Sequence, residues 1–261
     1  MTDAVKRHWP EYLMEAAGLG LFMISAAGFA IVLFHPAAPA ATLGPLLQRI
    51  LMGMVMGLTA IALIHSPWGK QSGAHFNPAV TLTFLRLGRV APWDATFYVG
   101  AQFVGGVAGL AVVVAAVGRL VSAPSVNYVV TIPGPRGVSI AFVAELAIAF
   151  VMMTMVLVTT ARLPRLAPFT GLLAGVLVAV YITLEAPLSG MSLNPARSFA
   201  SALLAQLWTG FWIYLIAPVL GMLLAAEVHQ RSSAAAVPCA KLHHANDRRC
   251  IFRCRYARNP S

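Results

Sequence analysis

Two eight-residue stretches decide the fold of this sequence: Ser72-Gly73-Ala74-His75-Phe76-Asn77-Pro78-Ala79 and Ser189-Gly190-Met191-Ser192-Leu193-Asn194-Pro195-Ala196. The second repeats the pattern of the first, 117 positions later. Asparagine is among the best helix N-caps, and proline suits the first helical position because its missing N–H would have no partner there. Each stretch therefore predicts a helix that begins abruptly, one at Asn77 and one at Asn194.

The two helices that follow these stretches are too short to cross a bilayer. Residues 78–87 and 195–205 would form helices about 13–16 Å long, near half the hydrocarbon thickness. Six other apolar stretches are long enough to cross it. They are residues 12–34, 46–65, 95–118, 138–160, 169–185 and 211–229. We predict an all-α membrane protein with six transmembrane helices and two re-entrant half-helices.

The composition excludes a soluble domain and supports this fold. Hydrophobic residues make up 59% of the 261 residues and charged residues only 10%, whereas soluble domains carry about 25% charged residues. Three spans in each half place the halves in opposite orientations, so the half-helices enter from opposite faces as an inverted 3+3 repeat. We expect an N-terminal segment over residues 1–11, a channel domain over 12–229 with repeats at 12–118 and 138–229, and a basic, disordered tail over 230–261.

The distribution of lysines and arginines along the chain indicates how the protein is oriented in the membrane. Fourteen of the 18 lysines and arginines fall on one side if both termini are cytoplasmic, and seven of them lie in the last 31 residues. Cytoplasmic loops carry an excess of such residues, so we predict a multi-pass protein of the cell membrane with both termini in the cytoplasm. The same distribution argues against nucleic acid as a partner, although the formal net charge is +10. A basic tail of this kind would be attracted to anionic lipid.

Two helix N-termini that meet near the midplane aim their positive dipole ends at one point. A cation or proton is repelled there, while a water oxygen can accept hydrogen bonds from the two asparagine amides. The doubled Asn-Pro-Ala motif, Asn77-Pro78-Ala79 and Asn194-Pro195-Ala196, resembles that of the major intrinsic protein family of aquaporins and glycerol facilitators. This resemblance implies an aquaporin-like bundle, one pore per subunit and a homotetramer in the lipid bilayer.

The resemblance also implies a selectivity constriction. Arg197 lies in the first turn of the second half-helix, and Ile182 and Met191 fall at two further constriction positions. The fourth position is Met56 if the loop at 66–71 carries one extra residue, or Gly57 if it does not. Water-selective members usually have an aromatic residue and a histidine in this set, and this chain has neither. Ser198 fits water channels, because glycerol facilitators usually have aspartate there.

We therefore predict a passive water channel that excludes protons and ions, with a facilitator of glycerol or other small neutral solutes as the alternative. An ion-coupled secondary transporter is less favoured, because Glu15 and Glu145 resemble glutamates that accept hydrogen bonds from the half-helix loops rather than carry protons. His75 either lines the pore or is a packed loop histidine. The spans hold no nucleophile–base pair, so we expect no enzyme and no cofactor.

The tail contains five residues of metal-ligating type. They are Cys239, His243, His244, Cys250 and Cys254. Their spacing matches no strong zinc pattern, because closed zinc sites usually show tighter pairing of their ligands along the chain. We expect no metal site.

Overall fold

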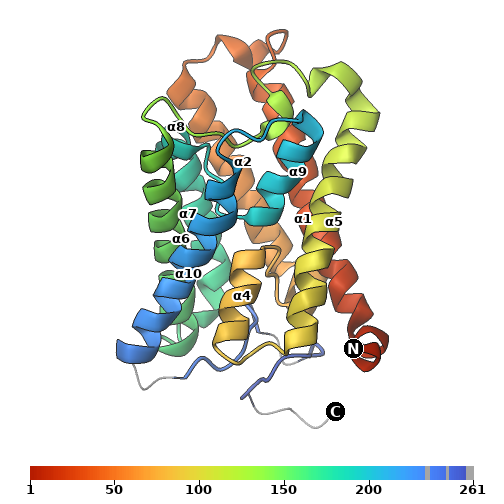
Figure 1. The fold of residues 1–261 in the computed structure, drawn as a ribbon, viewed down its shortest axis with the longest axis vertical. Helices are drawn as coiled ribbons and strands as arrows, with labels where there is room; N and C mark the ends of the chain where they lie inside the picture. Colours follow the sequence, from red (N-terminus) through yellow and green to blue (C-terminus); the bar gives the residue numbers. More distant parts are fainter. Residues whose placement is uncertain (233–235, 245–246, 257–261) are drawn as a thin grey trace.

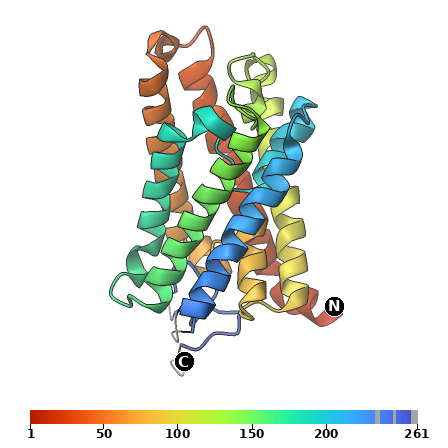
Figure 2. The same cartoon turned by 60° about the vertical axis from the view of Figure 1, so that its left-hand side comes forward.

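The computed structural model describes residues 1–232, 236–244 and 247–256. Within these residues, six helices are long and apolar enough to cross a membrane, which confirms the predicted fold class (Figures 1 and 2). They are α1 (Thr2–Phe34), α2 (Pro45–His65), α5 (Pro92–Val117), α6 (Val138–Ala161), α7 (Thr170–Leu184) and α10 (Phe211–Ser232).

Two shorter helices correspond to the predicted half-helices. These are α4 (Pro78–Arg86) and α9 (Pro195–Ala205), and each starts with an asparagine cap followed by proline. A short helix precedes each loop, α3 (Pro67–Ser72) before α4 and α8 (Ala186–Ser189) before α9. Single 3₁₀ turns complete the connections: η1 (Pro39–Thr42), η2 (Gly118–Leu120), η3 (Asn127–Val129) and η4 (Ala167–Phe169).

The packing of the helices follows the inverted repeat. In the first half α1 packs on α5, and in the second half α6 packs on α10 in the same way. Each half-helix lies against the other half's third span, α4 on α10 and α9 on α5, while α2 and α7 pack on each other. Figure 1 shows α4 and α9 inside the bundle, one nearer each end. The two halves therefore share one interior.

Close helix contacts depend on small residues. A Cβ atom on Gly105 of α5 would lie 2.1 Å from the carbonyl oxygen of Ala16 in α1, so only glycine fits there. Gly57 of α2 faces α7 in the same manner, because its Cβ would lie 2.6 Å from the Gly175 carbonyl oxygen. In a membrane, where the surrounding lipid is as apolar as the helices, such close backbone approach is a main source of helix association.

The start of the chain differs from the sequence prediction. Residues 1–11 were expected to precede the first span, but α1 already begins at Thr2 and continues through Pro10. Asp94 of α5 explains the extension, since one of its carboxylate oxygens lies 2.7 Å from His8 Nδ1 and accepts a hydrogen bond of 2.6 Å from the Tyr12 hydroxyl. The contact of His8 lies outside the apolar pattern that marked the span, and that of Tyr12 lies at its first residue.

The tail also differs from the predicted disordered segment. Helix α10 runs to Ser232, and the tail residues that the structure describes pack against the end of the bundle where α1 begins (Figure 1). Lys241 is only 2% exposed, and its ammonium donates hydrogen bonds to the carbonyl oxygens of Lys70 (2.8 Å) and Arg249 (2.7 Å). Phe252 is buried as well. A disordered tail was predicted over 230–261, whereas the structure has 230–232 in α10 and packs 236–244 and 247–256 against the bundle. The other residues of the predicted tail, 233–235, 245–246 and 257–261, lie outside the described part.

Candidate functional site

The loops before α4 and α9 have the same unusual backbone. Gly73 and Gly190 end the preceding short helices with φ values of 96° and 84°. The next residues, Ala74 and Met191, also have positive φ, at 56° and 52°. Non-glycine residues rarely adopt this region and need surrounding structure to hold them there. Two loops 117 residues apart therefore carry matching local strain.

A buried glutamate holds each loop in place. Glu15 Oε1 accepts hydrogen bonds from the Ser72 hydroxyl (2.7 Å) and the His75 N–H (3.1 Å), and its Oε2 accepts one from the Phe76 N–H (2.6 Å). Backbone N–H groups without a partner would otherwise cost free energy at this depth. The carboxylate of Glu15 thus accepts the hydrogen bonds that water would otherwise have to accept from this loop.

Glu145 holds the second loop in the same pattern. It accepts hydrogen bonds from the Ser189 hydroxyl at 2.7 Å, from the Ser192 N–H at 2.6 Å and from the Leu193 N–H at 2.8 Å. Both glutamates are fully buried. The sequence predicts a loop-supporting role for both, and each accepts hydrogen bonds from one of the two loops.

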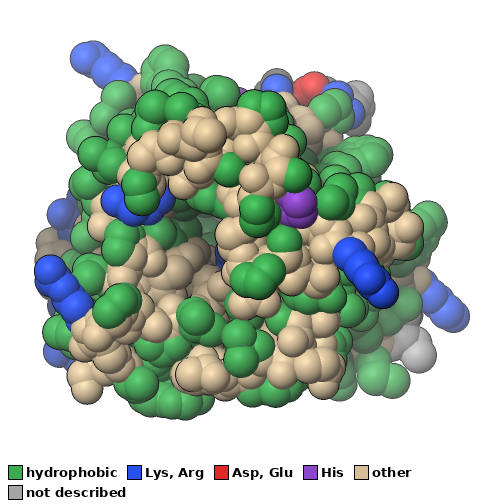
Figure 3. All heavy atoms as spheres, turned by 90° about the horizontal axis from the view of Figure 1, so that it is seen from above, with side chains coloured by type: hydrophobic (Ala, Val, Ile, Leu, Met, Phe, Trp, Pro, Cys, Tyr) green, Lys and Arg blue, Asp and Glu red, His purple; other side chains and the backbone are tan. Residues whose placement is uncertain are grey.

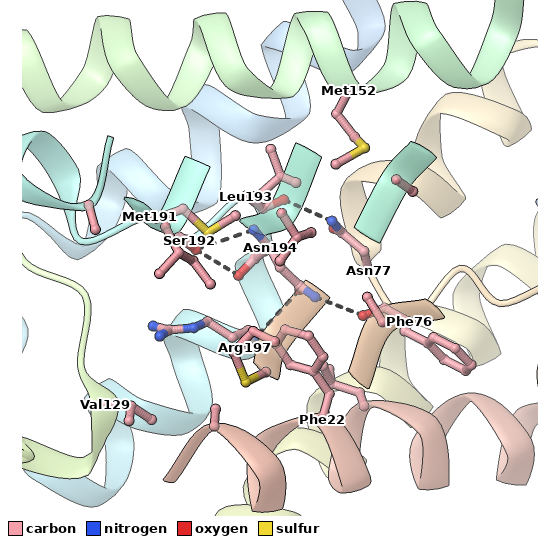
Figure 4. A pocket seen from close by; sticks show the side chains of 18 of the residues that line it. Phe22, Phe76, Asn77, Val129, Met152, Met191, Ser192, Leu193, Asn194 and Arg197 are labelled. Carbon is pink, nitrogen blue, oxygen red and sulfur yellow. Dashed lines mark hydrogen bonds between the residues drawn. The ribbon is translucent and has the colours of Figure 1, made fainter. Parts of the chain in front are cut away.

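The two asparagines cap their own helices and bridge to the opposite loop. The side-chain oxygen of Asn77 accepts from the Ala79 N–H, and that of Asn194 accepts from the N–H groups of Ala196 and Arg197. Asn77 Nδ2 donates to the Leu193 carbonyl oxygen (2.8 Å), while Asn194 Nδ2 donates to that of Phe76 (2.7 Å), as Figure 4 shows. An amide nitrogen has two protons, so each asparagine keeps one N–H for another acceptor.

A cavity of about 300 Å³ runs between the two half-helices. Apolar side chains from α1, α2, α6 and α7 form most of its wall, and Asn77, Asn194 and Arg197 are among its polar groups. The lining extends from Leu242 of the tail at one end to Arg49 and Ser125 at the other. Figure 3 looks onto the end away from the tail and shows a hollow in the middle of that face. A mostly apolar channel with a few converging polar groups is the arrangement of a small-solute path.

All four residues expected at the constriction line this cavity: Met56, Ile182, Met191 and Arg197. The structure favours Met56 over Gly57, which packs against α7 instead. In Figure 4 Met191 and Arg197 lie on the same side of the two asparagines. Arg197 Nη1 is buried and has no hydrogen-bond partner among the described residues. The guanidinium therefore keeps one buried donor nitrogen that no described residue accepts from.

Several lining residues could not be found from the sequence motifs. Phe22 of α1 places its ring in the cavity beside the half-helices (Figure 4). Val129 lies in η3, where Asn127, Tyr128 and Val129 all have positive φ between 41° and 51°. No composition or motif signal marks either residue, because both reach the cavity only through tertiary packing. Met152 of α6 is a further example.

His75 is a packed residue of the first loop. Its Nδ1 lies 3.0 Å from the Thr81 hydroxyl and its Nε2 lies 2.7 Å from the Ala240 carbonyl oxygen. Its ring stacks between Phe84 and Phe252, each with a centroid separation of 5.3 Å. His75 also belongs to the cavity lining, so the two alternatives left open by the sequence both hold in part.

The charges along the cavity have one sign. Arg49 and Arg197 both belong to the lining, and none of the described lining residues carries a carboxylate. The N-termini of α4 and α9 add partial positive charge at the asparagines. The described part of the cavity wall therefore carries positive charge and no negative charge.

Comparison with known proteins agrees with this geometry. The family model for the major intrinsic protein matches residues 3–229. A probable NIP-type aquaporin of Nicotiana alata is 31% identical, over 71% of this chain and 67% of its own length. Glycerol uptake facilitator protein-like 6 of Lactiplantibacillus plantarum is 34% identical, over 83% and 94%. The match spans less than two thirds of some plant relatives, such as 61% of aquaporin NIP1-2 of Arabidopsis thaliana.

A solved structure supports the fold independently. The aquaglyceroporin of Plasmodium falciparum superposes with a TM-score of 0.69 over 85% of this chain and 95% of that one, at 19% identity. The family model covers far more than half of the chain, both Asn-Pro-Ala motifs included. The chain belongs to the major intrinsic protein family.

Proposed function

We propose that this channel conducts water passively and excludes protons and ions. The family to which it belongs consists of channels and not of enzymes. The observation that carries the proposal is the cavity between two capped helix N-termini, with Arg197 in its wall and no carboxylate among the described lining residues. A water molecule needs only hydrogen-bond partners there, whereas a cation would need a compensating negative charge.

The asparagines supply those partners. Each amide uses one N–H for the opposite loop carbonyl, so its second N–H can donate to the oxygen of a passing molecule. Exclusion of protons and cations by half-helix dipoles and a pore arginine is the general mechanism of aquaporin-type pores. Nothing in the described lining of this cavity opposes that mechanism.

Facilitated passage of glycerol or another small neutral solute is the alternative. Ile182, Met191 and Met56 make the constriction apolar, which would favour contact with a CH surface. One relative is named a glycerol uptake facilitator. Ser198 argues for water, since its hydroxyl bonds with Ser192 and Thr131 where facilitators usually have an aspartate.

An ion-coupled transporter is less well supported. Coupling to protons needs a carboxylate that the transported species can reach. The carboxylates of Glu15 and Glu145 are committed to the two loops through hydrogen bonds from backbone N–H groups and serine hydroxyls.

The setting of the channel follows from the same reasoning. We place it in the cell membrane with both termini in the cytoplasm, because fourteen of 18 basic residues then lie on the inner side. We also propose a homotetramer with one pore per subunit, the assembly that the resemblance to the family implies. Chemical cross-linking in native membranes tests the tetramer, and a tag accessible only from inside tests the orientation.

Transport through proteoliposomes tests the function directly. Stopped-flow light scattering compares osmotic shrinkage with glycerol re-entry, and a pH-sensitive dye in the lumen reports proton entry. We expect shrinkage faster than that of protein-free vesicles, slow glycerol entry and no proton flux beyond that of protein-free vesicles. Fast glycerol entry would establish the alternative. Leu242→Gly removes the tail side chain that lines one end of the cavity. Water flux equal to that of empty vesicles, both in the full chain and in this variant, would overturn the channel proposal.

A further inference from the structure

Four potential metal ligands from separate parts of the tail converge on one point. They are Cys239, His244, Cys250 and Cys254. Their ligand atoms all lie within 4.8 Å of one another, with Cys239 Sγ 3.5 Å from Cys250 Sγ and Cys254 Sγ 3.2 Å from His244 Nε2. Tetrahedral zinc with bonds of about 2.3 Å to sulfur and 2.0–2.1 Å to nitrogen separates its ligand atoms by roughly 3.5–3.8 Å. The distances among the four ligand atoms, which include 3.2 and 3.5 Å and do not exceed 4.8 Å, are close to that separation.

We propose that Cys239, His244, Cys250 and Cys254 bind one Zn²⁺ ion, and that this ion fixes the tail across one mouth of the pore. Three sulfurs and one imidazole form a common closed structural zinc set, and soft thiolates favour zinc over magnesium or calcium. The inference uses the proposed function in two respects: the cavity is treated as the pore, and the tail is placed in the cytoplasm, where thiols stay reduced. The spacing along the chain does not reveal the site, because folding creates it.

The surroundings suit the charge of such a site. Binding releases three thiol protons to solvent, and Zn²⁺ with three thiolates and a neutral imidazole has a net charge of −1. Arg89 lies within electrostatic range of Cys239 and Cys254, and its buried Nε has no hydrogen-bond partner among the described residues. Arg255 and Lys241 add further positive charge nearby. A site of net negative charge would offset this accumulation of cations.

The proposed ligands lie next to the part of the tail that contacts the first half-helix loop. Cys239 and His244 lie on either side of residues 240–242, which contact the first half-helix loop. The Ala240 carbonyl oxygen lies 2.7 Å from His75 Nε2, and the Leu242 N–H donates to the Gly73 carbonyl oxygen at 3.1 Å. Leu242 lines the cavity itself. A metal bound at both ends of this short turn would clamp Leu242 into the mouth.

The tail needs such a clamp for physical reasons. Its described residues after Ser232 contain no helix or strand. Small folded units that have little hydrophobic core of their own often depend on a disulfide or a metal to stay ordered. Lys241 and Phe252 are buried, so the tail is seen here in its packed state. The proposed ion would supply the missing stabilisation.

The zinc content of the purified full chain is the first test. The protein is prepared in detergent without a polyhistidine tag and without chelator, and metals are measured by plasma mass spectrometry. We expect one zinc per chain, and loss of that zinc in Cys250→Ser and in Cys254→Ser. His243→Ala is the matched control and keeps its zinc, because His243 is adjacent to the site but outside the cluster. A zinc-free protein, or a Cys239–Cys250 disulfide found by mass spectrometry, would overturn the proposal.

Trypsin reports the clamp independently of transport. Lys241 is buried in the clamped state, so cleavage after it is slow while zinc is bound. Removal of zinc with a strong chelator should speed cleavage after Lys241 severalfold, and added Zn²⁺, unlike Mg²⁺, should reverse the change. Equal cleavage with and without zinc would contradict the clamp even if the metal is bound. Neither readout depends on which solute the channel carries.

Discussion

Glu15 and Glu145 show how single residues permit an irregular loop inside a membrane. Replacing Glu145 with alanine leaves the Ser189 hydroxyl and the N–H groups of Ser192 and Leu193 without their acceptor. We expect a loss of about 3 kcal/mol or more of stability, because each buried, unsatisfied donor costs about 1–3 kcal/mol. The apparent melting temperature in detergent, followed by tryptophan fluorescence, measures it.

Glu227→Ala provides the control for this substitution. Glu227 pairs with Arg86, but its side chain is 33% exposed. Removal of an exposed ion pair costs about 0–1 kcal/mol. Equal shifts of the melting temperature for Glu145→Ala and Glu227→Ala would show that Glu145 does not support the second loop.

Ile182 is one of the residues that we propose to set the selectivity of the channel. Histidine at this position would add a hydrogen-bonding group to an apolar part of the cavity wall. We expect Ile182→His to raise the ratio of water to glycerol permeability in proteoliposomes. Leu184→His, in the same helix but outside the cavity lining, should leave that ratio unchanged. An unaltered ratio in Ile182→His would remove Ile182 from the constriction.

The residues that could be predicted from the sequence are those whose role is local or repeated. A cap followed by proline identifies a helix start from three residues, and its recurrence 117 positions later identifies the partner. The bond from each asparagine to the opposite loop could not be predicted, because it depends on how two distant loops meet. Phe22 carries no signal that separates it from lipid-facing residues of the same helix.

At the scale of elements, the contact between α1 and α5 depends on glycine. Valine at position 105 would place its Cβ 2.1 Å from the Ala16 carbonyl oxygen, and a backbone atom cannot move aside cheaply. We expect Gly105→Val to destabilise the protein by about 3 kcal/mol or more, at the upper end of overpacking costs. Loss of the monodisperse peak in size-exclusion chromatography and a lower melting temperature would report this.

Gly100→Val in the same helix separates packing from helix propensity. A Cβ on Gly100 meets no atom within 4 Å, while the change in intrinsic helix propensity is the same at both positions. We expect Gly100→Val to behave like the wild type. Comparable damage from both variants would mean that valine itself, and not contact with α1, disturbs α5.

The elements differ in how well the sequence predicts them. The six spans follow from apolar length alone, and their predicted limits agree with the structure to within a few residues except at the start of α1. A hydropathy pattern does not predict that start, because it depends on the contacts of His8 and Tyr12 with Asp94. Such a pattern does not predict the packed tail either, since the order of the tail depends on contacts with the first half-helix loop.

At the scale of the whole molecule, the tail and the cavity are joined through the first half-helix loop. The first half-helix loop is held from inside by Glu15 and contacted from outside by residues 240–242. The hydrogen bonds of Glu15 and those of the tail therefore meet at residues 72–76. We expect a change in the order of the tail to alter one mouth of the cavity, because Leu242 lies there.

Removal of zinc should therefore open the channel. In proteoliposomes made from the full chain, we expect a membrane-permeant zinc chelator to increase water flux severalfold, because Leu242 leaves the mouth once the clamp is lost. Leu242→Gly should conduct at the raised level before chelation and respond little to it, since its mouth is already unobstructed. Cys254→Ser should also conduct at the raised level and respond little to the chelator, because it lacks one of the proposed zinc ligands. If chelation strips the zinc but leaves the flux of the wild type unchanged, the tail covers the mouth without closing the water path, and control of permeability must lie elsewhere along the cavity.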